Sequence, residues 1–169
     1  LKHAAGVQSA IRDFWNIADL RKDSETGLLD KQGYMRLSWK LHKALVPNVT
    51  EEEAAASAEK DWESDSEGEP YLNFERFSNS LFELADIWVE TIEADEYEEF
   101  LRRMLFAICD QKSGTRSFRL DANISCQLED DSDEDDEVWE VNEADAIDEP
   151  APAQHKKKRS SVDAGDNGE

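Results

Sequence analysis

The chain has 169 residues, of which 36% are charged, and its formal net charge at pH 7 is -22. So acidic a chain repels phosphate backbones and anionic lipid headgroups, which argues against nucleic acid and membrane surfaces as partners and favours basic proteins or cations. No apolar run approaches the roughly 20 residues of a membrane-spanning helix, and two cysteines make no disulfide framework. We therefore expect a cytoplasmic protein in a reducing compartment.

Apolar residues recur at three- and four-residue spacing in five segments of the first 110 residues, which predicts five amphipathic helices. These segments span residues 7–18, 34–45, 51–62, 74–88 and 95–108. The third has a strong start signal, because Thr50 stands at the cap position and Glu53 follows three residues later, the pattern of a capping box. Asp95 and Glu98 repeat this spacing at the start of the fifth segment.

The apolar pattern fades after Cys109. Between Glu129 and Glu149 the chain has thirteen acidic residues and no lysine or arginine, so this stretch buries too little apolar surface to offset the entropy lost on ordering. A basic cluster follows at residues 156–159. We predict a helical domain over residues 1–110 and a disordered acidic tail over residues 111–169.

Two loops between predicted helices carry polar residues, a glycine and then an apolar residue, in the same order. The first contains Lys22, Ser24, Thr26, Gly27, Leu29 and Gly33. The second contains Glu63, Asp65, Glu67, Gly68, Leu72 and Arg76, with Glu69 and Pro70 counted as an insertion. The order of helix, loop and helix thus appears twice within residues 5–90.

This repeated unit resembles the EF-hand superfamily, in which a twelve-residue loop holds calcium through alternating oxygen ligands, a turn glycine and a closing bidentate glutamate. The resemblance implies an all-α fold, an EF-hand-like pair of helix-loop-helix units plus a fifth helix. It also implies that Leu29 and Leu72 lie side by side in a short antiparallel pairing between the loops. The run from Ser80 to Trp88, followed by Glu96, Tyr97 and the segment at 100–105, is similar to degenerate EF-hand proteins of flagellated protists, which implies a ciliary or flagellar structural role.

Both loops depart from the ligand pattern of that family. In the first, Lys22 stands at the first ligand position and Gly33 at the closing one, and in the second Arg76 replaces the closing glutamate. We therefore expect calcium binding to be weak or lost. The weak candidate ligands that remain are Glu63, Asp65 and Glu67.

The chain lacks a phosphate-binding glycine loop, a nucleophile elbow and a paired acid and base, so we expect no enzymatic activity and no small-molecule substrate. The first hypothesis is a protein-interaction or structural module that binds basic or helical protein targets. The fifth helix then either fills the groove of the pair or is itself the docking surface. The candidate partner-binding residues are Trp88, Tyr97, Phe100 and Met104.

Two alternatives stay open. One is a calcium sensor that uses the 63–76 loop, and the other is a protein whose acidic tail shields basic partners. The cluster at residues 156–159 resembles a nuclear-localisation signal, which makes the nucleus an alternative location. Ser64 lies among acidic residues in a context that resembles an acidophilic kinase site.

Overall fold

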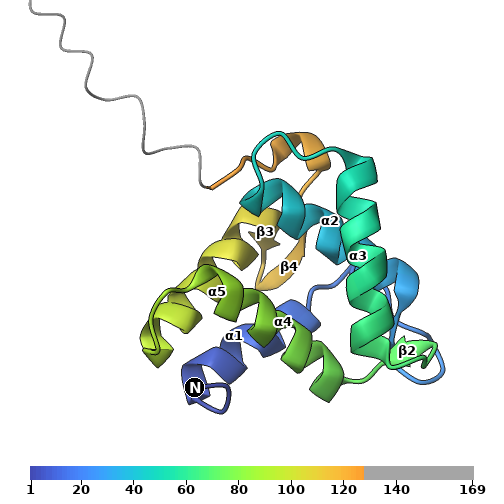
Figure 1. The fold of residues 1–169 in the computed structure, drawn as a ribbon, viewed down its shortest axis with the longest axis horizontal. Helices are drawn as coiled ribbons and strands as arrows, with labels where there is room; N and C mark the ends of the chain where they lie inside the picture. The colour runs from blue at the N-terminus through green and yellow to red at the C-terminus, as the bar shows by residue number, and fades with distance from the viewer. Residues whose placement is uncertain (128–169) are drawn as a thin grey trace, which may run out of the picture. The chain divides into compact units, whose positions relative to one another are not determined.

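A computed structural model describes residues 1–127, so the acidic run at 129–149 and the basic cluster at 156–159 lie outside the described residues. The described chain is mostly helical, with two small antiparallel sheets (Figure 1). Its helices are α1 (Ala5–Trp15), α2 (Lys31–Leu45), α3 (Glu51–Ser66), α4 (Phe74–Trp88) and α5 (Ala94–Ile108). The five predicted helices are therefore confirmed. Within residues 1–127, none of them has the length and apolarity that crossing a bilayer requires.

Side chains of the preceding residues define where three of the helices begin. At α3 the predicted capping box is confirmed, because the Glu53 N–H donates to Thr50 Oγ1 at 3.2 Å and the Thr50 N–H donates to Glu53 Oε2 at 3.0 Å. Asp30 and Asn73 cap α2 and α4 in the same way. The predicted cap of α5 is wrong: this helix follows Glu93, and Asp95 lies in its first turn, where negative charge complements the helix dipole.

The two interhelical loops are joined by a short sheet. Strand β1 (Leu29–Asp30) pairs antiparallel with β2 (Tyr71–Leu72), and Leu29 lies opposite Leu72. Both leucine side chains are fully buried. The predicted pairing of these two residues is therefore confirmed, and it fixes the two helical hairpins relative to each other.

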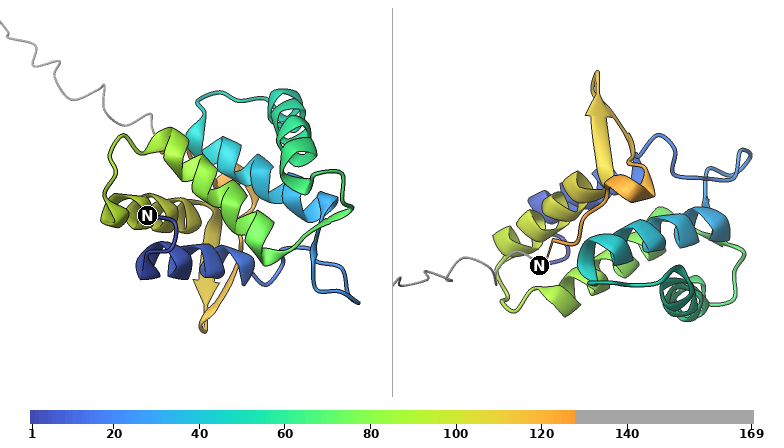
Figure 2. Two further views of the ribbon diagram at one scale, coloured as in Figure 1. Left: turned by 60° about the horizontal axis from the view of Figure 1, so that its bottom comes forward. Right: turned by 90° about the horizontal axis from the view of Figure 1, so that it is seen from above.

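One apolar interior is shared by both hairpins and by α5. Helix α1 packs mainly on α5 and α2 mainly on α3, while α4 touches α1, α3 and α5. Figure 2 shows α1 and α5 lying alongside each other, with α4 next to them. The largest fully buried side chains come from α1, the short sheet, α4 and α5, and include Phe14, Leu29, Leu72, Phe77 and Leu101.

The folded part continues beyond the predicted boundary at residue 110. Strands β3 (Cys109–Lys112) and β4 (Thr115–Phe118) form an antiparallel hairpin, and a 3₁₀ turn, η1 (Asp121–Asn123), follows. The hairpin turns at Ser113 and Gly114, whose φ angles of 50° and 79° suit the right-handed twist of the strands. The fold is therefore mostly helical with two small sheets, and the predicted tail start at residue 111 falls inside the folded part, because Phe118 and Ile124 are buried in the core.

A buried lysine anchors this last segment to α2. Lys40 is only 3% exposed, and its Nζ donates to the Arg119 carbonyl oxygen and to Asp121 Oδ1, each at 2.6 Å. Further along, the Gln127 N–H donates to the Ala44 carbonyl oxygen at 2.8 Å. The described chain therefore ends at the C-terminal end of α2.

Candidate functional site

The two loops are structurally equivalent around their paired leucines. One residue after each leucine is the capping side chain, so the Gly33 N–H donates to Asp30 Oδ1 at 2.7 Å and the Arg76 N–H donates to Asn73 Oδ1 at 2.9 Å. Gly33 and Arg76 each lie four residues after their leucine. They therefore occupy the same position in the first and second loops.

Polar groups of the chain itself close the first loop. Asp23 Oδ1 accepts hydrogen bonds from the backbone N–H of Thr26 at 2.8 Å and of Glu25 at 3.1 Å, and from the Thr26 hydroxyl at 2.8 Å. These donors hold the pKa of Asp23 below its usual range. The ammonium of Lys22 lies 4.5 Å from the centre of the Trp15 ring and donates to the Trp15 carbonyl oxygen, so this cation is engaged with α1.

Gly33 marks a close approach of two backbone segments. A Cβ atom at this position would lie 2.2 Å from the Arg21 carbonyl oxygen and 2.7 Å from Leu29 Cδ1. Both distances are well below van der Waals contact, and the oxygen belongs to the backbone. The closing position of the first loop therefore accommodates glycine and has no space for a larger side chain.

The second loop begins later than the sequence predicted, because α3 continues through Ser66. Glu63 and Asp65 are therefore helical, and residues two apart on a helix point about 200° away from each other. Gly68 has a φ of 82° and lies four residues before Leu72, whereas Gly27 lies two residues before Leu29, so the two residues counted as an insertion still separate the turn glycine from the leucine in the second loop. Within α3, the side chains of Glu63 and Asp65 therefore do not face one common point.

A guanidinium group closes this second loop. Arg76 Nη1 donates to the Ser66 carbonyl oxygen at 2.6 Å and Nη2 donates to Glu67 Oε2 at 2.9 Å. Asp65 Oδ2 accepts instead from the Tyr34 hydroxyl at 2.7 Å. Among residues 1–127, no three or more His, Cys, Asp or Glu side chains form a group that could hold a metal ion. The three candidate calcium ligands thus are not gathered around one point.

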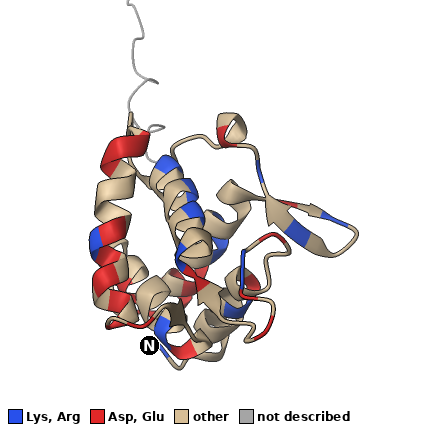
Figure 3. Cartoon of the chain, turned by 90° about the vertical axis from the view of Figure 1, so that its right-hand side faces the viewer, with Lys and Arg blue, Asp and Glu red and all other residues tan. Residues whose placement is uncertain are grey.

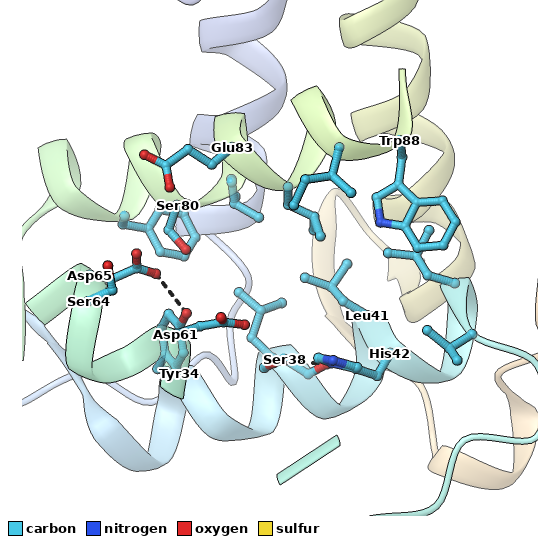
Figure 4. A pocket seen from close by; sticks show the side chains of 17 residues that line it. Tyr34, Ser38, Leu41, His42, Asp61, Ser64, Asp65, Ser80, Glu83 and Trp88 are labelled. Atoms are coloured by element: carbon cyan, nitrogen blue, oxygen red, sulfur yellow. Dashed lines mark hydrogen bonds between the residues drawn. The ribbon is translucent and has the colours of Figure 1, made fainter. Parts of the chain in front are cut away.

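A groove lies between α2, α3 and α4 and encloses about 220 Å³ (Figure 4). Its lining from α4 extends from Phe77 to Trp88, which corresponds to about 17 Å along the helix at 1.5 Å per residue. Most of the lining is apolar and comes from two helices. These apolar residues are Leu37, Leu41 and Leu45 on α2, Val46 just after it, and Phe77, Leu81, Leu84, Ile87 and Trp88 on α4.

Carboxylates line the rim of this groove. Asp61 and Asp65 come from α3 and Glu83 comes from α4. Partial desolvation raises the pKa of Asp61, and the neighbouring charge of Asp65 raises it further. Burial and the hydrogen bond to Asp65 likewise raise the pKa of Tyr34. The whole of α3 carries seven acidic residues and one lysine, and Figure 3 shows them along this helix. The rim is therefore electronegative.

The four predicted partner-binding residues divide into two groups. Trp88 is 36% exposed and lines the groove. Tyr97, Phe100 and Met104 are 2%, 5% and 1% exposed, because the apolar face of α5 is buried against the other helices. In the described structure these three side chains therefore belong to the core and are not exposed to a partner.

Sequence reasoning did not single out two exposed isoleucines near Trp88. Ile87 is 76% exposed and Ile92 is 79% exposed, and Ile87 lines the groove. The position of Ile87 could have indicated its exposure, because Ile87 lies outside the stripe of apolar residues that α4 turns towards the core. Ile87 and Trp88 therefore form an exposed apolar end of the groove at the C-terminus of α4, and Ile92 follows in the next loop.

Comparisons of the chain with protein-family models, with curated proteins and with solved structures give no match.

Proposed function

We propose that this chain is a non-enzymatic protein-interaction module that binds a basic amphipathic helix of a partner protein in the groove between α2, α3 and α4. The proposal rests on one observation, the combination of an apolar groove with a carboxylate rim. An apolar stripe on the partner would enter the groove, and lysine or arginine on its flanks would face Asp61, Asp65 and Glu83.

The dimensions of the groove favour a helix over a small molecule. Pockets for drug-sized ligands enclose about 300–1,000 Å³, whereas this groove encloses about 220 Å³. It extends along about three turns of α4 and continues onto the exposed Ile87 and Trp88. A narrow, elongated apolar surface suits anchor residues at three- and four-residue spacing on one helix face.

We further propose an EF-hand-like pair in which charged groups of the chain, and not calcium, close the loops. The equivalent loops and the Leu29–Leu72 pairing support the EF-hand-like part of this proposal. The guanidinium of Arg76 and the lack of space at Gly33 support the loss of calcium binding. A cytoplasmic setting is proposed from the cysteine content, and a cilium or flagellum within it from the sequence resemblance alone.

Peptide binding by the full chain tests the interaction role. The probe is a fluorescent, lysine-rich amphipathic helical peptide, and its affinity is measured by anisotropy with calcium and with a chelator. We expect binding that is the same in both buffers and that Ile87→Glu weakens at least tenfold. Because Ile87 is 76% exposed, this substitution should leave stability within about 0.5 kcal/mol of the wild type.

Leu120→Glu is the matched control, because Leu120 is 74% exposed and is not part of the groove lining. Equal affinities of the wild type and Ile87→Glu would contradict docking in the groove. Calcium-dependent binding, accompanied by strong heat in a micromolar calcium titration, would favour the sensor alternative. If a chain shortened after Gln127 loses the peptide, the acidic-tail alternative is favoured instead.

A further inference from the structure

Two serines at the end of α3 have the same acidic sequence context. Glu67 follows Ser64 by three residues, and Glu69 follows Ser66 by three residues. Kinases with basic substrate sites select hydroxyls by such downstream charges. The sequence therefore does not distinguish the two serines.

The structure separates them by burial. Ser66 is 2% exposed and its carbonyl oxygen is bonded to Arg76, so its hydroxyl is enclosed. Ser64 is exposed and lies in the last turn of α3, where it lines the groove. Figure 4 shows Ser64 next to Asp65 at the opposite end of the groove from Trp88.

We propose that Ser64 is a phosphorylation site that tightens the docking of a basic helix in the groove. This inference rests on the proposed function. In the reaction, Ser64 Oγ forms a bond to the γ-phosphorus of ATP, held by an acidophilic protein kinase. The bond from that phosphorus to the β–γ bridging oxygen breaks, ADP leaves, and the hydroxyl proton passes to the base of the kinase.

The phosphate acts through the electrostatics of the rim. It adds a charge of about -1.5 to -2 beside Asp61 and Asp65; desolvation, and after it repulsion by Asp65, already raise the pKa of Asp61. A cationic partner helix relieves this repulsion, so the modified chain binds it more tightly. From the energies of exposed charge pairs, we expect the phosphorylated chain to bind the cationic helix about three- to tenfold more tightly at low salt. This gain in affinity should fall as salt is added.

The last turn of α3 must open for Ser64 to enter a kinase, since such enzymes read an extended segment. Two contacts hold this turn: the Tyr34 hydroxyl on Asp65, and Arg76 on the Ser66 carbonyl. Opening one terminal turn costs less free energy than unfolding the domain. Releasing one contact with Arg76→Gln is therefore expected to speed the modification of Ser64.

The first experiment maps the phosphate. The full chain is incubated with an acidophilic serine/threonine kinase and MgATP, digested and analysed by mass spectrometry. We expect phosphate on Ser64, none on Ser66, and none on Ser57, an exposed serine of the same helix that is followed at the third position by Lys60. Ser132, which lies among acids in the sequence, reports that the kinase is active. Modified Ser132 with unmodified Ser64 would overturn the proposal.

The second experiment measures the effect on binding. The fluorescent basic peptide is titrated into phosphorylated and unmodified chain, and into Ser64→Ala chain treated in the same way to separate Ser64 from other sites. We expect tighter binding of the phosphorylated wild type only. Affinities within twofold at low salt would overturn the regulatory role of Ser64. Failure of every form to bind the peptide would instead overturn the groove itself, because the mass measurement does not depend on the peptide.

Discussion

Arg76 holds the second loop closed, and its replacement by glutamine removes the guanidinium while keeping a polar side chain. The shorter amide loses the donors to Ser66 and Glu67. Because these contacts stabilise the loop, we expect Arg76→Gln to lower the free energy of unfolding.

The two contacts of Arg76 contribute unequally to the free energy of unfolding. Hydrogen bonds that involve a charged group contribute about 1.5–3 kcal/mol, and the Ser66 acceptor belongs to a residue that is only 2% exposed, so water replaces the lost donor poorly. The Glu67 side chain is 70% exposed, and such surface pairs contribute about 0.2–1 kcal/mol. We expect a loss of about 2–3 kcal/mol, which for a folded part of this size lowers the Tm by about 6–15 °C.

Urea denaturation monitored by tryptophan emission and circular dichroism measures this loss, with an unchanged m value as the sign of an unaltered unfolding reaction. Lys31→Gln is the matched control, because the side chains of the Lys31–Glu59 pair are 44% and 48% exposed. Removing this pair should lower the free energy of unfolding by at most about 0.5 kcal/mol. An Arg76→Gln chain that unfolds at the same urea concentration as this control would refute the role given to Arg76.

Further substitutions test the first loop and the anchor of residues 119–127. Gly33→Ala should lower the free energy of unfolding by about 2 kcal/mol or more, because its Cβ would meet the Arg21 carbonyl oxygen. Gly27→Ala should lower it by about 1 kcal/mol, because Gly27 has a φ of 68° but open space around it. Equal losses for the two variants in urea denaturation would refute the steric argument. The hydrogen bond from Lys40 holds the pKa of Asp121 below its usual range. The ionised carboxylate therefore stabilises the fold at pH values above the pKa of an ordinary aspartate, and this stabilisation is lost as the pH falls through the lowered pKa. Because the Asp121 side chain is 51% exposed, water screens this pair, so Asp121→Asn should cost at most about 1 kcal/mol at neutral pH and progressively less in acid. A difference from the wild type that is independent of pH would contradict this pairing.

Local patterns predicted much of this fold. The five helices followed from apolar spacing, which reflects the 3.6-residue period that any helix with one buried face must obey. The capping box at Thr50 was also readable, because its donors and acceptors lie within four residues. The pairing of Leu29 with Leu72 followed from their equivalent positions in two similar loops.

Features that depend on partners distant in the sequence were predicted less well. The hairpin at Cys109–Phe118 is short and largely polar, so it gave no apolar period, although Ser113 and Gly114 supply its turn. Tyr97, Phe100 and Met104 were identifiable as one apolar face, but whether that face met the core or a partner depended on the position of α1.

The sequence by itself determined the helical segments, the acidic charge and the presence of Gly33 and Arg76 four residues after Leu29 and Leu72. Only the tertiary structure decided what these two residues do, since the contacts of Arg76 with Ser66 and of Gly33 with Arg21 require the chain to turn back on itself. It also decided which of two similar serines is accessible. The physical reason is that period and composition are properties of a segment, whereas burial and charge pairing depend on neighbours that folding brings together.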